Sequence, residues 1–371
     1  MPNQKHLLRF CFCGILFLFS DCRVKQNDTT PLLPLKDLNP NIAVGSPIEI
    51  SFNNDKYYNT IKSEFNTGQG LWYARSCWQS KTSYKFSELN ENINWMAQFG
   101  LKPTVHMLVG QDRYMPDWLI NGNWKKTDLE NMLRDMIYKI MDTNDNKNKV
   151  DSWNVINELF EDDGSYRTNM VWNKLGWEAD SSGLSGDDKI NKIHPVFIRK
   201  AFTFCREKTT KNLELREFNI ESNNPSTPLN KKHKAFYQLV KHMLNVHIPI
   251  DAVGIQGHLY VGQSGWRFEK NALKNTVQKL KELGIEVYIT ELDASLETSV
   301  WSKTSAQKQK DDYYNYVKQA IEGGASRIYL WGIQDGMDKG WLTYEHPLLW
   351  DSALNKKPAY YGFSKALYDT K

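Results

Sequence analysis

The sequence predicts an α/β fold, a (β/α)8 TIM barrel, and three observations lead to this prediction. Eight short apolar runs typical of buried parallel strands alternate with amphipathic stretches typical of helices. A chain of 371 residues is long enough for one such barrel, which takes about 250 residues or more with insertions. Two of the apolar runs end in a glutamate, at the strand ends where barrel enzymes assemble their sites.

The eight expected strands are short, and seven of them contain Val, Ile or Leu, residues that suit strands covered on both faces. From first to last we expect them at residues 42–44, 64–67, 103–109, 150–157, 213–219, 250–256, 285–290 and 327–331. An aromatic segment, residues 71–78, follows the second of them.

The expected helices carry apolar residues at helical spacing between these strands. Pro195 suits the first turn of one helix, and Gly323 follows the end of another. A stretch rich in Gly, Ser and Asp, residues 162–191, interrupts the alternation and predicts a long loop over the catalytic edge of the barrel. We expect the helices at residues 88–99, 127–141, 195–208, 232–246, 268–283 and 305–322.

The first 22 residues are typical of a bacterial secretion signal and not of a folded domain. A basic-leaning start precedes an apolar run, residues 10–19, that is too short to span a bilayer stably. The segment also resembles a lipoprotein signal, in which Cys22 would carry the lipid, although ordinary secretion stays open because Asp precedes that cysteine. We expect residues 23–40 to form a polar, proline-broken tether. Residues 41–371 would then form the catalytic domain.

The composition argues against nucleic-acid binding and favours carbohydrate. The net charge of +4 comes from interspersed Lys, Asp and Glu without a long basic block. Aromatic residues make up 13% of the chain, with 13 Trp and 18 Tyr, and such rings pack on the apolar faces of sugars. If Cys22 is lipidated, Cys77 and Cys205 remain, and we expect both to be free thiols.

Two glutamates at strand ends predict a catalytic pair. Glu158 follows the fourth strand and Glu291 follows the seventh, and two carboxyls acting as proton donor and nucleophile hydrolyse glycosides. A single glutamate at a strand end is more often a solvated residue or a helix cap. Asn157, Thr290 and Asp293 change this balance, because they offer amide, hydroxyl and acid partners that could orient a carboxylate.

Motifs over residues 42–368 make the chain resemble glycoside hydrolase family 10, whose well-known members are retaining endo-β-1,4-xylanases. The motifs that carry the resemblance stand at or after the fourth, sixth, seventh and eighth strands. They read WNVINE at 153–158, PIDAVGIQGH at 249–258, ITELD at 289–293, WGIQD at 331–335, GWL at 340–342, PLLWD at 347–351 and KPAY at 357–360.

The resemblance implies a role for each matching residue. Glu158 would be the acid/base, holding its proton with the help of partial burial and of ionised Glu291, which would be the nucleophile. Their carboxyls should then lie only about 5–5.5 Å apart. The remaining implied site residues bind the sugar or orient the nucleophile: Asn157 at the 2-hydroxyl, His258 against Glu291, His106 and Gln256 at the cleavage subsite, and Trp331 and Trp341 as its aromatic walls.

The chain departs from the family pattern beside the expected subsites. Gln69, Gly70 and Tyr73 stand where a Glu-Asn-x-x-Lys motif is usual after the second strand. Residues 110–111 read GQ where Trp-His is common, and residues 216–219 read REFN where Asn-Asp-Tyr-Asn is usual. We expect Trp72 and Tyr73 to replace hydroxyl recognition by ring stacking, so that the enzyme accepts a different or decorated glycan, or prefers other chain positions.

The function that follows is a retaining endo-β-1,4-glycanase, most simply an endo-β-1,4-xylanase that hydrolyses xylan by double displacement. One alternative is a glycanase of the same fold acting on another plant or algal polysaccharide. The other is a surface glycan-binding lipoprotein without turnover, although such a binder has no use for both glutamates. We expect a monomer that is secreted or anchored to the surface or outer membrane of a bacterium, with membrane contact only through lipid on Cys22.

No metal or cofactor is expected, because two carboxyls hydrolyse glycosides without one. His106, Gln256 and His258 could be mistaken for metal ligands, but no spaced set of His, Cys and Asp accompanies them.

Overall fold

The computed structural model describes most of the chain beyond its first 29 residues. The described residues are 30–50, 54–181, 183, 190–222, 230–261, 271–296, 300–336 and 342–371. The chain divides into Met1–Pro31, nearly all of which lies outside the described residues, and Leu32–Lys371, which contains the barrel.

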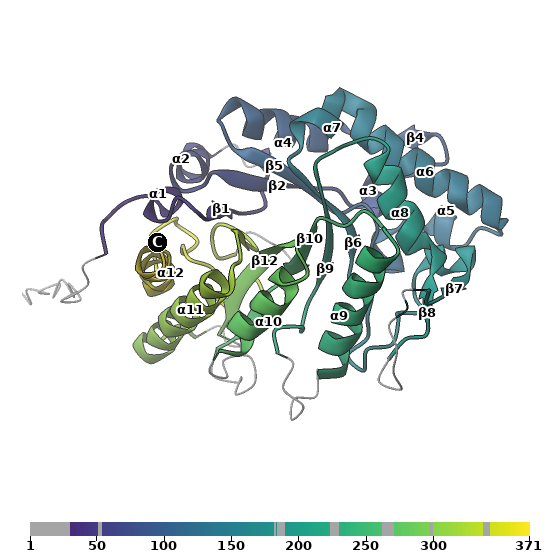
Figure 1. The fold of residues 1–371 in the computed structure, drawn as a ribbon. Helices are drawn as coiled ribbons and strands as arrows, with labels where there is room; N and C mark the ends of the chain where they lie inside the picture. Colours follow the sequence, from purple (N-terminus) through teal and green to yellow (C-terminus); the bar gives the residue numbers. More distant parts are fainter. Residues whose placement is uncertain are drawn as a thin grey trace, which may run out of the picture. The chain divides into compact units, whose positions relative to one another are not determined.

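Eight parallel strands form a nearly closed barrel, as the sequence predicts. Their order around the sheet is β1-β13-β12-β10-β9-β6-β5-β2, and Figure 1 shows them inside the ring of helices. An isolated parallel bridge between Pro47, just beyond β1, and Gln69 of β2 links the two ends of the sheet. The strands are β1 (Ala43–Gly45), β2 (Thr67–Leu71), β5 (Lys102–His106), β6 (Ser152–Asn157), β9 (Asn212–Glu217), β10 (Ala252–Ile255), β12 (Glu286–Ser295) and β13 (Arg327–Leu330).

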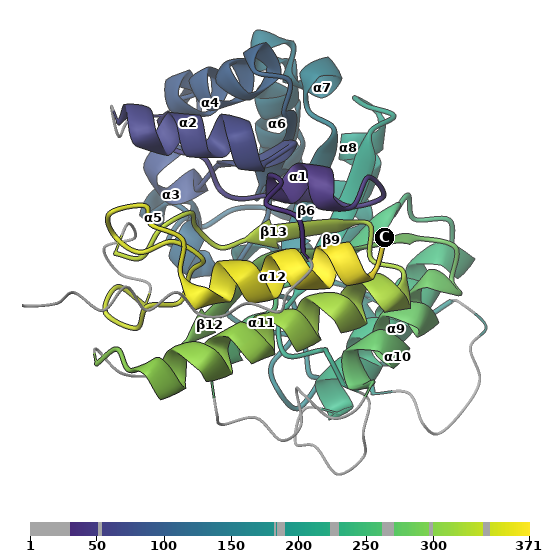
Figure 2. The same cartoon turned by 90° about the vertical axis from the view of Figure 1, so that its left-hand side faces the viewer.

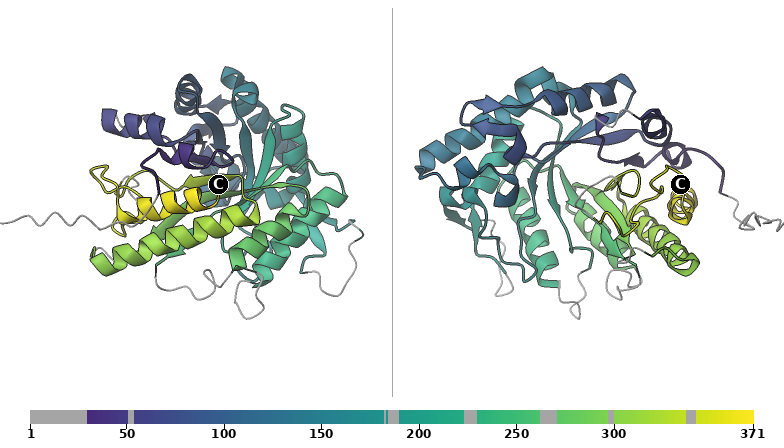
Figure 3. Two further views of the ribbon diagram at one scale, coloured as in Figure 1. Left: turned by 60° about the vertical axis from the view of Figure 1, so that its left-hand side comes forward. Right: turned by 180° about the vertical axis from the view of Figure 1, so that it is seen from behind.

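The longer helices lie outside the strands and bury their apolar faces against them, as Figure 3 shows from two further directions. Local capping fixes some of their ends: Asn54 accepts two backbone N–H groups at the start of α2, and Ser302 forms a capping box with Ser305 at the start of α11. These helices are α2 (Asp55–Glu64), α4 (Ser87–Gln98), α6 (Lys126–Asp142), α8 (Val196–Arg206), α9 (Asn230–Asn245), α10 (Ala272–Lys281), α11 (Lys303–Gly323) and α12 (Pro358–Asp369).

Short elements decorate the ends of the barrel. Two antiparallel hairpins, β3 (Trp78–Ser80) with β4 (Ser83–Tyr84) and β7 (Trp177–Ala179) with β8 (Ile193–Pro195), lie outside the main sheet, and β11 (His258–Tyr260) pairs with the end of β12. The remaining pieces are the short α-helices α1 (Leu35–Leu38), α3 (Ala74–Cys77), α5 (Asp117–Ile120) and α7 (Asn146–Lys149), and the 3-10 helices η2 (Asp112–Tyr114), η3 (Thr143–Asp145) and η4 (Val171–Leu175).

The second strand differs from its predicted position. It was expected at residues 64–67, but β2 spans Thr67–Leu71, and Glu64 is the last residue of α2. The segment TGQGL contains two glycines and little branched apolar character, so its sequence is weak as a strand signal. The polar segment expected after this strand is therefore the strand itself, and its side chains alternate between the barrel interior and the helices.

Other segments also carry structure that the sequence analysis did not predict. Helices α2 and α12 were not among the expected helices, and the hairpin strand β7 lies inside the stretch 162–191 that was expected to be a loop. The expected start of the helix at 268–283 lies outside the described residues, and the described helix, α10, begins at Ala272.

The end of the expected tether packs onto the barrel domain. Leu35 and Leu38 of α1 are buried, and the side-chain amide of Asn39 donates to the backbone carbonyl of Leu367 in α12 at 3.2 Å. Figure 2 shows α1 beside α12, which in turn lies along α11. Apolar contact thus orders residues that the sequence analysis assigned to the tether. Among the described helices, none is long and apolar enough to cross a bilayer.

Candidate active site

The two candidate catalytic glutamates lie on strands that are separated in the sheet by β9 and β10. Glu158 directly follows β6, and Glu291 lies within β12. Gln256, at the end of β10, connects them: its amide Nε2 donates to Oε1 of Glu158 at 3.0 Å, and its backbone carbonyl accepts from the backbone N–H of Glu291 at 2.8 Å. Both glutamates are almost completely buried. The electrostatic field of Glu158 also reaches Glu291 and raises its pKa.

Glu158 is held in a left-handed backbone conformation, with φ of 61°. This conformation is uncommon for a residue with a side chain and recurs at functional sites. Its backbone N–H donates to the carbonyl of Arg216 on the neighbouring strand β9 at 3.0 Å. The strand therefore turns sharply at its end, and the carboxylate of Glu158 is fixed at the edge of the barrel.

Three donors surround the carboxylate of Glu158. Besides Gln256 at Oε1, the amide of Gln111 donates to Oε2 at 2.5 Å, and the guanidinium of Arg113 donates to the same oxygen at 3.1 Å. Gln111 is buried, whereas the side chain of Arg113 is 60% exposed. The amide contacts are thus fixed parts of the interior, and the arginine can leave without opening the core.

The carboxylate of Glu291 has one oxygen in an ion pair with His258 and one that receives no hydrogen bond within the described part of the chain. Oε2 lies 3.4 Å from Nε2 of His258. Oε1 is buried and receives no hydrogen bond from the described residues, with Nδ1 of His106 at 3.7 Å. Burial raises the pKa of Glu291, while its contact with His258 and the more distant charge of Arg216 act in the opposite direction.

His258 lies between two carboxylates. Its Nε2 faces Glu291, and its Nδ1 lies 3.1 Å from Oδ2 of Asp293, which is fully buried. Burial disfavours the charged imidazolium, but Asp293 and then Glu291 outweigh it and raise the pKa of His258 to about 10. The histidine is therefore a cation at neutral pH and stabilises the ionised form of Glu291.

Asn154 and Asn157 form a second buried group, which connects the site to His106 at the end of β5. The amide Nδ2 of Asn154 lies 3.0 Å from Nδ1 of His106 and donates to Oδ1 of Asn157 at 3.3 Å. Gln256 also donates to this oxygen of Asn157, at 3.4 Å. Burial lowers the pKa of His106 well below its usual range, with smaller contributions from nearby positive charges, so this imidazole is neutral.

Aromatic rings surround this cluster. Trp331 follows β13 and meets the ring of His106 edge to face at 5.2 Å and that of His258 at 6.4 Å. Tyr73 stacks on Tyr114 with ring centroids 5.6 Å apart and meets the ring of His106 edge to face, with centroids 6.2 Å apart. All three aromatic residues are partly exposed, as residues that contact a sugar need to be.

The expectation that Trp72 takes part in ring stacking with sugar is wrong. Trp72 is fully buried and stacks on Phe86 with ring centroids 5.5 Å apart. Successive side chains of an extended segment point to opposite faces, and Trp72, just beyond β2, therefore points toward the surrounding helices and away from the barrel mouth. Of the two aromatic residues that follow β2, only Tyr73 lies near the candidate site.

The substituted positions Gln69 and Arg216 contact each other inside the barrel. The guanidinium of Arg216 donates through Nη1 to Oε1 of Gln69, and its Nε donates to Glu214 at 2.7 Å. The Gln69 amide also donates to the backbone carbonyl of Thr290, at 2.9 Å. A Cβ atom on Gly254 would lie 2.6 Å from Cγ of Arg216, so this glycine makes room for the arginine. The changes on the second and fifth strands are therefore parts of one buried network.

The structure brings together every predicted site residue that it describes. These are Glu158, Glu291, His106, Asn157, Gln256, His258 and Trp331. Trp341 lies outside the described residues. The expected contact of Thr290 with Glu291 is absent from the described bonds, because Thr290 is turned the other way and donates to the carbonyl of Ile255 at 3.4 Å.

Sequence reasoning missed Gln111 and Arg113. Both lie on the connection that follows β5, where the loop and η2 carry them to the carboxylate of Glu158. The departure from the family pattern at residues 110–111 was visible in the sequence. It pointed to the right position, but the sequence could not show that the new amide contacts the acid.

Comparisons with known proteins agree with this geometry. A family model described as glycosyl hydrolase family 10 matches residues 39–366. The chain is 25% identical over 326 residues to Endo-1,4-beta-xylanase B of Thermotoga neapolitana, and the match covers 84% of each protein. Exoglucanase XynX of Acetivibrio thermocellus is 26% identical over 334 residues, and the match covers 85% of this chain but 27% of that protein. The chain thus spans about a quarter of the length of this second relative.

A solved structure shows the same architecture. Native xylanase 10C of Cellvibrio japonicus superposes with a TM-score of 0.75 at 25% identity, covering 91% of this chain and 73% of that one. The family model spans most of the chain, and the barrel and the strand-end glutamates agree with it. The chain therefore belongs to glycosyl hydrolase family 10 and is a retaining glycoside hydrolase.

Proposed function

We propose that the enzyme is an endo-β-1,4-xylanase in which Glu291 is the nucleophile and Glu158 is the acid/base. The observation that carries this assignment is the unequal environment of the two carboxylates. Glu291 has a buried oxygen, Oε1, without a hydrogen bond from the described residues, whereas both oxygens of Glu158 are held by amides. A nucleophile needs a free oxygen, and a proton-transfer group needs a fixed orientation.

The first chemical step follows from these roles. Oε1 of Glu291 attacks the anomeric carbon, the bond from that carbon to the leaving sugar oxygen breaks, and Glu158 transfers its proton to that oxygen. The product is a glycosyl ester on Glu291. Gln256 contacts both residues, so it supports a fixed distance between proton donor and nucleophile.

The second step returns the enzyme to its starting state. Glu158, now a carboxylate, takes a proton from a water molecule whose oxygen attacks the anomeric carbon. The ester bond to Glu291 breaks, and its oxygen leaves as a carboxylate. His258, a cation between Asp293 and Glu291, favours this departure because it stabilises the negative charge on Glu291.

Asn157 and His106 are suited to contact the sugar at the cleavage point. Both are buried beside the two carboxylates and are fixed by Asn154. A hydrogen bond from the Asn157 amide to the sugar 2-hydroxyl would strengthen in the oxocarbenium-like transition state. Trp331 would form the apolar wall of the same subsite through its contact with the ring of His106.

The surface for the next sugar differs from the common family pattern. Gln69 and Arg216 contact each other and are fully buried in the barrel interior, so neither presents its side chain at an exposed sugar-binding surface. The stacked pair of Tyr73 and Tyr114 stands beside His106 instead. We expect ring stacking to replace part of the hydrogen bonding here, with greater tolerance of substituted sugars.

Product analysis on a panel of polysaccharides tests the proposal. Purified enzyme should release oligosaccharides from xylan, and Glu291→Ala should release none. Products from β-glucan or algal polysaccharides alone would show that the substrate is not xylan, while the type of reaction would stay as proposed. Binding without products on the whole panel would favour the glycan-binding alternative.

A second variant tests the roles of the two glutamates separately. Glu158→Ala should lose xylan cleavage but retain the first step on an aryl β-xyloside whose leaving group needs no proton. Added azide should then accelerate turnover and give a β-xylosyl azide, because it replaces the water that Glu158 activates. In Glu291→Ala, added azide should give the α-xylosyl azide, which supports Glu291 as the nucleophile. A β-azide from Glu291→Ala with an α-azide from Glu158→Ala would reverse the two roles.

A further inference from the structure

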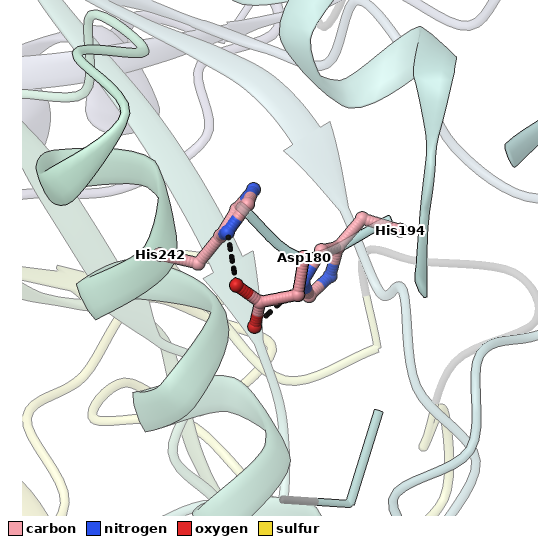
Figure 4. Close-up of side chains that lie close together, drawn as sticks. All are labelled: Asp180, His194 and His242. Carbon is pink, nitrogen blue, oxygen red and sulfur yellow. Dashed lines mark hydrogen bonds and ion pairs between the residues drawn. The ribbon is translucent and has the colours of Figure 1, made fainter. Parts of the chain in front are cut away.

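Three side chains that take no part in the proposed glutamate chemistry meet at the β7–β8 hairpin. Asp180, His194 and His242 each offer one ligand atom, and these atoms all lie within 4.8 Å of one another. Figure 4 shows the carboxylate of Asp180 directed at both imidazoles. Oδ1 lies 3.2 Å from Nδ1 of His242, and Oδ2 lies 3.4 Å from Nε2 of His194.

The fold brings these residues together from two separate elements. In the hairpin, Glu178 pairs with His194, and the backbone N–H of Asp180 donates to the carbonyl of Lys192 at 2.9 Å. Asp180 and His194 are therefore diagonal neighbours on one face of the hairpin. His242 comes from the last turn of α9 and stacks on His194 with ring centroids 4.0 Å apart.

The cluster is buried, and its side chains are 3% to 7% exposed. Nε2 of His194 is buried without a hydrogen bond to any described residue. A buried imidazole nitrogen without a hydrogen bond is a group that a metal ion would satisfy.

Tyr166 provides the outer partner that metal-binding histidines usually have. Its hydroxyl lies 2.6 Å from Nδ1 of His194, on the side of the ring opposite the cluster. When Nδ1–H donates to this hydroxyl, the lone pair of Nε2 points toward Asp180 and His242. Such hydrogen bonds fix the tautomer and the ring orientation of metal ligands.

We propose that Asp180, His194 and His242 bind a divalent transition metal ion, with Zn²⁺ as the first candidate. Two imidazole nitrogens and one carboxylate oxygen form a ligand set that zinc accepts. Tetrahedral Zn–N and Zn–O bonds of about 2.0–2.1 Å place neighbouring ligand atoms about 3.3 Å apart. Each imidazole nitrogen lies at about this distance from one oxygen of Asp180, Nδ1 of His242 at 3.2 Å from Oδ1 and Nε2 of His194 at 3.4 Å from Oδ2. Water would take the fourth position.

A metal here would join the segment after β6 to α9. Tyr166, the outer partner of His194, stacks on Phe160 with ring centroids 4.8 Å apart. Phe160 is two residues beyond Glu158, and its backbone N–H donates to Glu217 at 3.0 Å. The ion would thus fasten a loop that begins at the catalytic edge, while taking no part in bond cleavage.

Metal binding by the full-length protein, purified without a polyhistidine tag and treated with EDTA, tests the proposal directly. Titration with Zn²⁺ should show one tightly bound equivalent and raise the melting temperature. Co²⁺ should bind at the same stoichiometry and show the visible absorption of a low-symmetry nitrogen–oxygen site. Absence of a bound equivalent for both ions would overturn the proposal and leave a cluster held only by hydrogen bonds.

Matched variants identify the ligands. Asp180→Asn and His242→Gln should each weaken Zn²⁺ binding about 100-fold or more, and Tyr166→Phe about 10-fold, as outer partners do. His247→Asn is the control, because His247 lies exposed just beyond α9 in a left-handed conformation that asparagine accepts. Equal binding by Asp180→Asn and the wild type would overturn the assignment, as would loss of binding in His247→Asn. The Co²⁺ spectrum of the wild type tests the ligand set even if a variant does not fold.

Discussion

Replacing His258 by glutamine tests the charge arrangement around the proposed nucleophile. In the wild type, Asp293 and Glu291 raise the pKa of His258 to about 10 against the opposing effect of burial, whereas an unfolded chain has a histidine pKa of about 6.5. Between these two values the folded protein holds one proton that the unfolded chain has released. The stabilisation from this proton is complete below about pH 6.5 and is lost as the pH rises toward 10.

The size of this pH dependence of stability follows from the single proton that His258 keeps in the folded protein and releases on unfolding. In this window the free energy of unfolding should fall by about 1.4 kcal/mol per pH unit because of His258, or about 2.7 kcal/mol between pH 7.5 and pH 9.5. Other groups titrate in the same range, so the quantity to compare is the difference between the wild type and His258→Gln. Urea unfolding followed by circular dichroism at several pH values measures this difference.

The same variant changes the activity in a defined direction. Loss of the cation leaves burial to dominate at Glu291 and raises the pKa of this carboxyl further. The acid limb of the activity profile should therefore move to higher pH. An NMR titration of histidine provides an independent measurement, because the signal that disappears in His258→Gln should titrate near pH 10 in the wild type. A midpoint below pH 7, with equal slopes of stability for both proteins, would refute the reasoning.

Three further changes follow from buried contacts. Lys232→Met should lower the free energy of unfolding by about 3–5 kcal/mol, because Nζ of Lys232 lies 3.0 Å from buried Glu217 and the acid would lose its partner. Urea unfolding measures the loss, and adding Glu217→Gln should restore part of it. Gly254→Ala should lower stability by about 1–3 kcal/mol, since its new Cβ would meet Arg216 at 2.6 Å, and an unchanged melting temperature would contradict this. Trp331→Ala should lower kcat/KM about 10-fold through lost ring contacts, and Trp331→Phe should retain more activity than Ala in the same assay.

The barrel and its two glutamate strands could be predicted because their signals are local. The run at 150–157 contains Val150, Trp153, Val155 and Ile156 and is followed directly by Glu158, and β6 occupies all but its first two residues. The strand at 285–290 was likewise placed correctly, although β12 continues through Ser295. Strands buried on both faces are enriched in large and β-branched apolar residues, and this local pattern needs no knowledge of the rest of the chain.

Features that depend on distant contacts could not be predicted in this way. The segment TGQGL forms β2 because it pairs with β5, while its own glycines argue against a strand. Trp72 and Tyr73 are adjacent in sequence, yet one is buried in the core and the other lies beside His106. The histidine cluster of the β7–β8 hairpin joins residues 62 positions apart, and their spacing along the chain resembles no short metal motif.

The buried contact between Arg216 and Gln69 restricts how this barrel can diverge. Arg216 is fully buried, and Gln69 and Glu214 are its partners. Shortening Arg216 alone would remove the donor to Oε1 of Gln69 and to Oε2 of Glu214. Enlarging Gly254 would remove the space that the side chain of Arg216 occupies. These positions are therefore expected to change together among close relatives, and transplanting the more common residues one at a time should yield non-additive losses.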